Sequence, residues 1–511
     1  MVHSVSNHFD TAFLASMKSM LVMCFAILDV WAQEVAWIAG SPASVSISSK
    51  IYPGGRSGVG IWQEGINNVW LFGGLGISDN PFESPRLLND LWYFNGSSQT
   101  WHQVHQGAVF DSTVVEYRSS QIPRPRQLSA VCGAGNIMVV FGGLAEEDLA
   151  LGDLWVFDTV TKEWQSQEQA YNVQRNKSEP LLVRPAPRGD MAKWCTSTHL
   201  FIFGGVNGSN HIFSDMWKLS LQDLIWEEVA SSALAPSSLK DQNALSYPAG
   251  RNGAMAWTVE PDNLYLFGGN VLRQYFRKQH IAAGYTSDLW QYNIINDTWM
   301  FLKGHIQPGQ PGVYGHLGMP TDYNVPGCRK GGVTWTDANN YLWLFGGEGC
   351  DTLTPSDTSS SVLLTDYWCY NTLIGRWEWI GGSKEGNKPP IFRQKGKLTY
   401  SALIGGRTEA AAWKKNDNAV YLFGGMGHNG TQYYCYLNDL WLINISETVG
   451  LGVPFPVLYG FGLVFLGIFL VLCLVVIGVY VYDCSKGNRT PEWRLGSRDI
   501  ARYRHLLGND S

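Results

Sequence analysis

The chain has 511 residues, of which 45% are hydrophobic and 16% charged, and its formal net charge is −6. This mildly acidic balance argues against nucleic acid or heparin-like polyanions as partners.

Residues 1–32 are typical of a signal peptide. Lys18 precedes the apolar run LVMCFAIL, and Ala32 offers a small residue at the expected cleavage position. Asp29 and the long polar lead are less typical, and translation from Met17 would give a more compact signal without altering the mature chain. We therefore expect an exported mature chain that begins at Gln33.

Six repeated units follow. In each, an apolar run ends in a double glycine, an Arg precedes that pair by 16 or 17 residues, and an Asp-x-Trp triplet comes after it. The double glycines are Gly73-Gly74, Gly142-Gly143, Gly204-Gly205, Gly268-Gly269, Gly346-Gly347 and Gly424-Gly425. The triplets end in Trp92, Trp155, Trp217, Trp290, Trp368 and Trp441. The arginines are Arg56, Arg126, Arg188, Arg251, Arg329 and Arg407. Repetition this regular decides the architecture.

The spacings within a unit predict paired β-strands. The short apolar runs, rich in β-branched and aromatic residues and bounded by glycine, indicate buried strands rather than helices. The distances from Arg to the double glycine and from the first Trp to a second one barely vary, which indicates fixed register. The distance from the double glycine to the Asp varies between about 10 and 19 residues, so that connection is a loop.

This pattern resembles the kelch repeat, over roughly Gln33 to Gly450. The resemblance implies an all-β fold, a six-bladed β-propeller with one repeat per blade around a central channel. The repeat distance of 62 to 78 residues exceeds the usual value of about 50, and long loops account for the excess.

The sixth unit lacks the second Trp that the other five have. The sequence VAWIAGS around Trp37 is similar to WEWIGGS around Trp379 in the fifth unit. An open ring would leave unpaired strand edges. We therefore expect the N-terminal strand to complete the sixth blade.

Trp62, Trp194, Trp257, Trp335 and Trp413 stand six residues after an Arg, and Cys132 takes this place in the second unit. These side chains could line the channel, but packing between blades is the favoured interpretation.

One face of the propeller is expected to carry the binding surface. In a four-stranded meander, the connections from second to third strand and from fourth strand to the next blade emerge on the same side, and here these are long. They are Leu75 to Asn89, Asn270 to Ser287, Glu348 to Thr365, Met426 to Asn438 and Gly304 to Cys328. The opposite side has tight turns such as PDN and DANN.

Six of the nine cysteines lie in the expected external part, where three disulfides are possible. We expect a Cys328–Cys350 disulfide, with Cys369–Cys435 as a weaker prediction and Cys132 and Cys195 as packed thiols. Six Asn-x-Ser/Thr sequons are candidate glycosylation sites: Asn95, Asn176, Asn207, Asn296, Asn429 and Asn444.

Residues 457–482 predict a transmembrane helix. From Val457 to Tyr482 no residue is charged, and 26 residues form a helix of about 39 Å, which spans a hydrocarbon core of about 30 Å. Lys486 and Arg489 follow it, which favours a cytoplasmic C-terminus. Residues 451–456 would form a stalk and residues 483–511 a cytoplasmic tail.

These features predict a type I protein of the plasma membrane or another secretory membrane, whose propeller binds an extracellular protein or glycan. No catalytic or metal-ligating set can be mapped, and no cofactor is expected. The external histidines, from His102 to His428, are scattered without close ligand spacing. The alternative is a membrane-tethered oxidase resembling galactose oxidase, or a hydrolase, with its active site on the long-loop face.

Overall fold

The computed structural model describes residues 34–40, 52–77, 84–107, 121–167, 183–209, 211–230, 247–272, 274–276, 279–281, 283–353 and 361–445, together with Lys486. The chain divides into two compact units, Met1–Gly450 and Leu451–Ser511. The expected signal peptide, stalk and membrane helix, and the tail apart from Lys486, lie outside the described residues. Among the residues that are described, no helix combines the length and the apolar character needed to cross a membrane.

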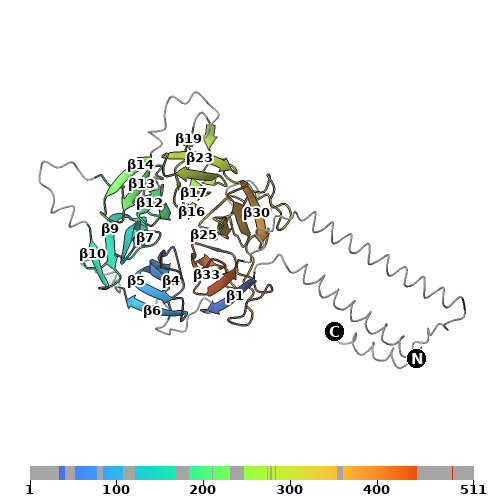
Figure 1. The fold of residues 1–511 in the computed structure, drawn as a ribbon, viewed down its shortest axis with the longest axis horizontal. Coiled ribbons are helices and arrows are strands. Elements are labelled where there is room, and N and C mark those ends of the chain that lie inside the picture. The colour runs from blue at the N-terminus through green and yellow to red at the C-terminus, as the bar shows by residue number, and fades with distance from the viewer. Residues whose placement is uncertain are drawn as a thin grey trace. The chain divides into compact units, whose positions relative to one another are not determined.

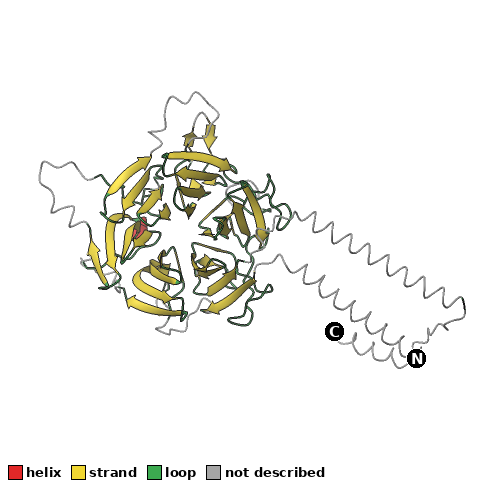
Figure 2. Cartoon of the chain, in the orientation of Figure 1, coloured by secondary structure: helices red, strands yellow, loops and turns green. Residues whose placement is uncertain are grey.

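The described part of the first unit is an all-β structure in which the 3-10 turn η1 (Glu146–Asp148) is the one helical element (Figure 2). Its antiparallel strands form sheets arranged around a central axis (Figure 1). The expected all-β propeller is therefore confirmed.

Six of the sheets in the described residues share a core of four strands. Sheet 1 has β3 (Gly60–Glu64), β4 (Asn68–Gly76), β5 (Arg86–Asn95) and β6 (Thr100–His105), with β2 (Arg56–Ser57) also on β4. Sheet 2 has β7 (Ala130–Ala134), β8 (Ile137–Leu144), β9 (Ala150–Asp158) and β10 (Glu163–Ser166). Sheet 3 has β11 (Ala192–Cys195), β12 (His199–Phe203), β13 (Met216–Ser220) and β14 (Trp226–Ala230).

The other three sheets continue the series. Sheet 4 has β16 (Met255–Val259), β17 (Asn263–Phe267), β22 (Leu289–Asn293) and β23 (Thr298–Lys303). Sheet 5 has β25 (Val333–Thr336), β26 (Leu342–Phe345), β29 (Tyr367–Asn371) and β30 (Arg376–Gly381). Sheet 6 has β32 (Ala411–Asn416), β33 (Ala419–Phe423), β36 (Leu440–Asn444) and β1 (Glu34–Ala39). First strands lie near the axis and fourth strands at the periphery (Figure 1).

Three smaller sheets, here called the crown sheets, continue sheets 4, 5 and 6 beyond their double glycines. They are β15 (Arg251–Asn252) with β18 (Asn270–Val271) and β21 (Gly284–Tyr285), β24 (Arg329–Lys330) with β27 (Glu348–Gly349) and β28 (Val362–Leu363), and β31 (Arg407–Thr408) with β34 (Met426–Gly427) and β35 (Cys435–Tyr436). A hairpin of β19 (Gln274–Phe276) and β20 (Gln279–Ile281) extends the loop of sheet 4.

The double glycine explains the break between a sheet and its crown. Gly346 and Gly347 have φ of 65° and 97°, a region that glycine enters without steric cost. A Cβ on Gly347 would lie 2.7 Å from the carbonyl oxygen of Lys330. The ladder of β25 and β26 therefore stops at the glycines, and the chain pairs again as β24 and β27.

The sheets pack face to face through apolar side chains. In β26 all four residues are buried, whereas buried positions alternate in β25. First-strand tryptophans lie between neighbouring sheets: Trp194 Nε1 donates to Tyr265 O at 2.9 Å, and Trp257 Nε1 donates to Trp343 O at 2.8 Å. The five first-strand tryptophans and Cys132 are all buried, as inter-sheet packing requires.

The N-terminal strand completes sheet 6, as expected. β1 pairs antiparallel with β36, with Val35 opposite Ile443. The turn that ends β1 repeats the end of β30, because Trp37 Nε1 donates to Ala39 O at 2.7 Å and Trp379 Nε1 donates to Gly381 O at 2.6 Å. β1 therefore takes the place of a fourth strand across more than 400 residues of chain.

Candidate functional site

The Arg of each repeat is buried and holds its own sheet together. In sheet 5, Arg329 donates two bonds to Asp366, at 2.7 and 2.8 Å, and one to the carbonyl oxygen of Gly346 at 3.0 Å. Trp368 Nε1 donates to the same carboxylate at 2.7 Å. The other five repeats have the same set, here called the clamp, formed by Arg56 with Asp90, Arg126 with Asp153, Arg188 with Asp215, Arg251 with Asp288, and Arg407 with Asp439.

In three of the clamps the arginine lowers the pKa of the carboxylate. Burial alone would raise the pKa of Asp288, but the charge and hydrogen bonds of Arg251 and the bond from Trp290 lower it. Burial is likewise outweighed at Asp153 and Asp215, where bonds from Arg126 and Arg188 lower the pKa. These buried ion pairs have a structural role.

The second glycine of each pair joins one repeat to the next. Gly347 N donates to the carbonyl oxygen of Arg407 at 2.8 Å, and four preceding repeats make the same contact. The series closes on itself, because Gly425 N donates to Arg56 O at 2.9 Å. The predicted kelch glycines and triplet tryptophans thus lie at the joints between neighbouring sheets.

A closed ring of backbone hydrogen bonds surrounds the axis. The residue two positions after each clamp Arg donates its N–H to the carbonyl oxygen of its counterpart in the preceding sheet, at 2.7 to 3.1 Å. This ring, the annulus, comprises Gly58, Leu128, Asp190, Gly253, Gly331 and Glu409. All six have φ between 56° and 66°, which is strained for the three that are not glycine.

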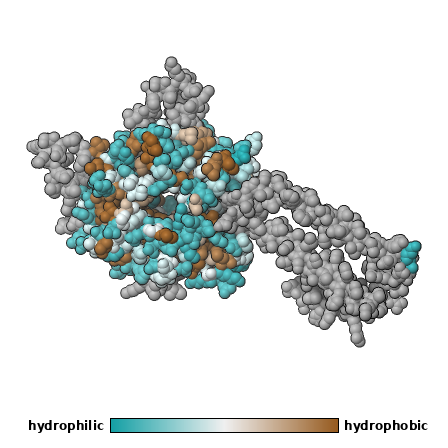
Figure 3. Space-filling view, viewed as in Figure 1, coloured by the Kyte–Doolittle hydropathy of each residue, from teal (hydrophilic) through white to brown (hydrophobic). Residues whose placement is uncertain are grey.

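Charged and aromatic side chains gather beside the annulus on the side of the crown sheets. They come from sheets 3 to 6, and we call them the channel-mouth cluster: Asp190, Asn252, Tyr285, Lys330, Glu348, Ser361, Glu409 and Tyr434. Figure 3 shows the surface hollowed at the centre of the ring.

Direct contacts link the cluster across the sheets. Asn252 Nδ2 donates to Asp190 Oδ2 at 2.7 Å. Lys330 Nζ lies 3.8 Å from Glu348 Oε2. Ser361 Oγ and the hydroxyl of Tyr285 donate to Glu348 Oε1, at 2.6 and 3.4 Å. The cluster is therefore an ordered polar network that presents tyrosine rings.

Burial makes this network sensitive to pH. It raises the pKa of Glu409 to about 7, with repulsion from Asp190 adding to the effect. It also raises the pKa of Asp190 and lowers that of the nearby Lys193 to about 8. Burial would lower the pKa of Lys330, but the surrounding Tyr285, Glu348, Asp190 and Glu409 raise it.

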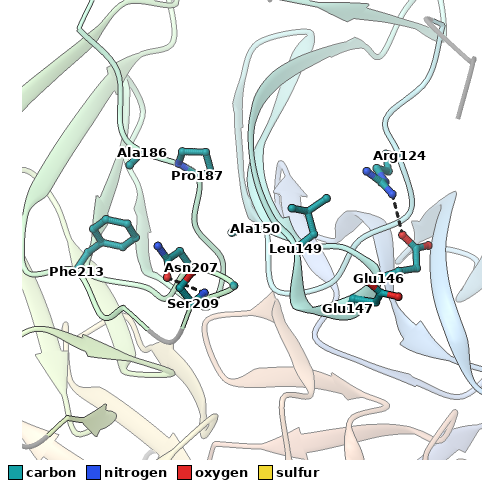
Figure 4. A pocket seen from close by; sticks show the side chains of 11 residues that line it. Arg124, Glu146, Glu147, Leu149, Ala150, Ala186, Pro187, Asn207, Ser209 and Phe213 are labelled. Carbon is teal, nitrogen blue, oxygen red and sulfur yellow. Dashed lines mark hydrogen bonds and ion pairs between the residues drawn. The ribbon is translucent and has the colours of Figure 1, made fainter. Parts of the chain in front are cut away.

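A pocket of about 660 Å³ lies between sheets 2 and 3. It is built from connections of the predicted long-loop side: η1 with Leu149 and Ala150, the segments that contain Arg124 and Pro187, and the connection from Asn207 to Phe213 (Figure 4). Arg124 Nη2 donates to Glu146 Oε2 at 3.2 Å in its wall.

Two disulfides cross-link the propeller. The expected Cys328–Cys350 bond is present. The expectation of packed thiols at Cys132 and Cys195 was wrong: they are bonded, with Cα atoms 5.4 Å apart. β7 and β11 are neighbouring first strands, so Cys132 forms a covalent joint where other sheets insert Trp. The Cys369–Cys435 prediction was also wrong, since Cys369 is a free thiol.

The predicted sequons differ in setting. Asn95 and Asn296 lie at turns between third and fourth strands, Asn444 lies on β36, and Asn429 and Asn207 lie on connections from second to third strands. Asn176 lies outside the described residues. His, Cys, Asp and Glu side chains form no group suited to a metal ion within the described ranges.

The comparisons with known proteins agree with this geometry. The family model described as the KLHDC2/KLHL20/DRC7 Kelch-repeats domain matches residues 41–179 and 106–319, which together span more than half of the chain.

Individual relatives are similar over about half of the chain. Tip elongation aberrant protein 1 of Schizosaccharomyces pombe is 26% identical over 50% of this chain and 18% of its own length. The flagellar outer-arm dynein alpha chain of Chlamydomonas reinhardtii is 25% identical over 41% of this chain and 4% of its own. Multiple epidermal growth factor-like domains protein 8 of Mus musculus is 24% identical over 46% of this chain and 7% of its own. The similarity thus spans under a fifth of each of these relatives, and by the family match the chain belongs to the kelch-repeat family.

Proposed function

We propose that the chain is a single-pass cell-surface protein whose six-bladed kelch propeller binds an extracellular protein or glycan at the channel mouth. Kelch-repeat domains generally bind protein partners. A surface location and an extracellular partner are proposed from the channel-mouth cluster and from the two disulfides.

The channel-mouth cluster is the observation that carries the binding proposal. It combines rings of Tyr285 and Tyr434 with charged groups on a rigid ring, and tyrosine beside buried polar groups is typical of residues that dominate binding energy. Two other side chains on second-to-third-strand connections lie close in sequence to members of the cluster and are exposed. They are Tyr433, exposed by 53%, and Leu353, exposed by 69%.

Disulfides support export. Bonds such as Cys132–Cys195 and Cys328–Cys350 persist in oxidising compartments and are rare in the cytosol. The apolar stretch from Val457 to Tyr482 would then be the membrane anchor, with the propeller outside the cell.

The test displays the full chain on cells and probes it with a panel of secreted ectodomains and immobilised glycans. Tyr434→Ala and Glu348→Gln should each weaken a bound probe several-fold, since the first removes a ring and the second removes the negative charge that faces Lys330. Leu373→Ala, at the exposed turn between β29 and β30, is the matched control and should bind normally. A probe lost in Leu373→Ala and retained in both other variants would place binding elsewhere.

A further inference from the structure

We propose that an N-linked glycan on Asn207 occupies the pocket between sheets 2 and 3, so that this part of the loop side is covered by sugar. The inference rests on the proposed export of the chain, because N-glycosylation requires the secretory pathway. It concerns the pocket of Figure 4 and not the channel mouth.

Asn207 lies in the wall of the pocket. It heads the sequon Asn207-Gly208-Ser209, and all three residues line the pocket. Its Oδ1 accepts from Ser209 N at 3.0 Å and from His211 N at 2.9 Å. These two bonds fix the amide plane, and Nδ2, the atom that would carry the sugar, donates to no other described residue.

The wall opposite Asn207 has the groups that bind sugars. Figure 4 shows Glu147 and Leu149 facing Asn207 and Ser209 across the pocket, with Arg124 and Glu146 behind. Carboxylates accept hydrogen bonds from hydroxyl groups, and the guanidinium of Arg124 donates them.

Apolar side chains complete the lining. Pro187, Phe213 and Leu149 present carbon surfaces, and Leu149 is 50% exposed. A pocket with an apolar lining and a few polar groups is suited to a small ligand, and its volume lies within the range of about 300–1,000 Å³ for such sites. A tethered sugar enters at high effective concentration, which favours it over a free ligand.

The walls of the pocket are also closely packed. The guanidinium of Arg188 lies 3.8 Å from the centroid of the Phe213 ring. Asp148 O lies 2.7 Å from where a Cβ on Gly208 would stand. The two walls are therefore held at a fixed spacing.

The experiment uses the full chain produced in secretory cells. Glycopeptide mass spectrometry reports occupancy at each sequon, and carbodiimide labelling reports access to the carboxylates of Glu146 and Glu147. We expect an occupied Asn207 and a several-fold rise in labelling in Asn207→Gln. Ser209→Ala should give the same rise, since it abolishes the sequon but keeps the Asn207 amide and the backbone donor of residue 209.

Asn296→Gln, which removes a sequon at the turn between β22 and β23, should leave this labelling unchanged. Occupied Asn95 and Asn296 with a vacant Asn207 would overturn the inference while leaving export intact. An occupied Asn207 with equal labelling in parent and variants would also overturn it. Absence of sugar at every sequon would instead overturn the proposed export, and this inference with it.

Discussion

The clamp Arg and the annulus residue lie two positions apart in every repeat, yet they differ in how strictly they repeat. Each clamp has the same Arg, Asp, Trp and glycine carbonyl with nearly the same bond lengths. In the annulus beside it, the six positions hold three glycines, a Leu, an Asp and a Glu. Repetition therefore marks what the architecture requires, and departure from repetition marks what is particular to this chain.

Removal of β1 is expected to destabilise the fold more than the substitutions that follow. Deleting residues 33–41 exposes the edge of β36 and leaves the ring open. We expect loss of cooperative unfolding, or aggregation, when the full chain is purified and melted. An unchanged melting temperature would mean that β1 does not close the ring.

Loss of a single clamp is expected to lower the stability of the fold less than loss of ring closure does, but still by a large amount. Asp288→Asn leaves the charge of Arg251 buried and unpaired, because both side chains are 1% exposed, and breaking such a pair costs about 3–5 kcal/mol. The matched control is the exposed Arg376–Asp322 pair, which also has two hydrogen bonds, donated by Nε and Nη2. Asp322→Asn should leave the melting temperature nearly unchanged, and equal losses in the two variants would refute the role of burial.

The smallest change in stability is expected from a substitution in the channel-mouth cluster. The pKa of Glu409 is about 7 in the folded protein, against about 4.3 for an unfolded chain. The folded state thus binds this proton more tightly, and the stability that this group contributes is lost as the pH rises from about 4 to above 7.

Glu409→Gln keeps the shape and cannot ionise. Its melting temperature should exceed that of the parent at pH 8, and the gain should shrink at pH 6. A gain that is the same at both pH values would mean that ionisation of Glu409 is not the cause. Glu163→Gln, at an exposed position of β10, serves as a reference for loss of a carboxylate away from the cluster.

The sequence predicted the parts of the fold that repeat. The double glycines located the second strands, and the similarity of Trp37 to Trp379 located the closing strand, because both are local patterns. Pairing of Arg251 with Asp288 was missed, although the recurrence of one Arg and one Asp in each of the six units was a usable signal.

Other features could not be predicted because they form only after closure. Asp190 and Glu409 are more than 200 residues apart and meet at the axis. Cys132 and Cys195 lie in different repeats, and nothing in either repeat alone distinguishes a packed thiol from a half of a disulfide. Contacts between sheets depend on the ring, whereas contacts within a sheet depend on the repeat.

Hydrogen exchange of the full chain measures whether the ring is closed between sheets 6 and 1. The amides to follow are those of the second glycines, above all Gly425, whose acceptor is Arg56 O, and that of Gly58, whose acceptor is Glu409 O. We expect these two amides to exchange as slowly as those of Gly347 and Gly331, because all four hydrogen bonds break only when the whole ring opens. Fast exchange confined to Gly425 and Gly58 would show that the ring is open between sheets 6 and 1.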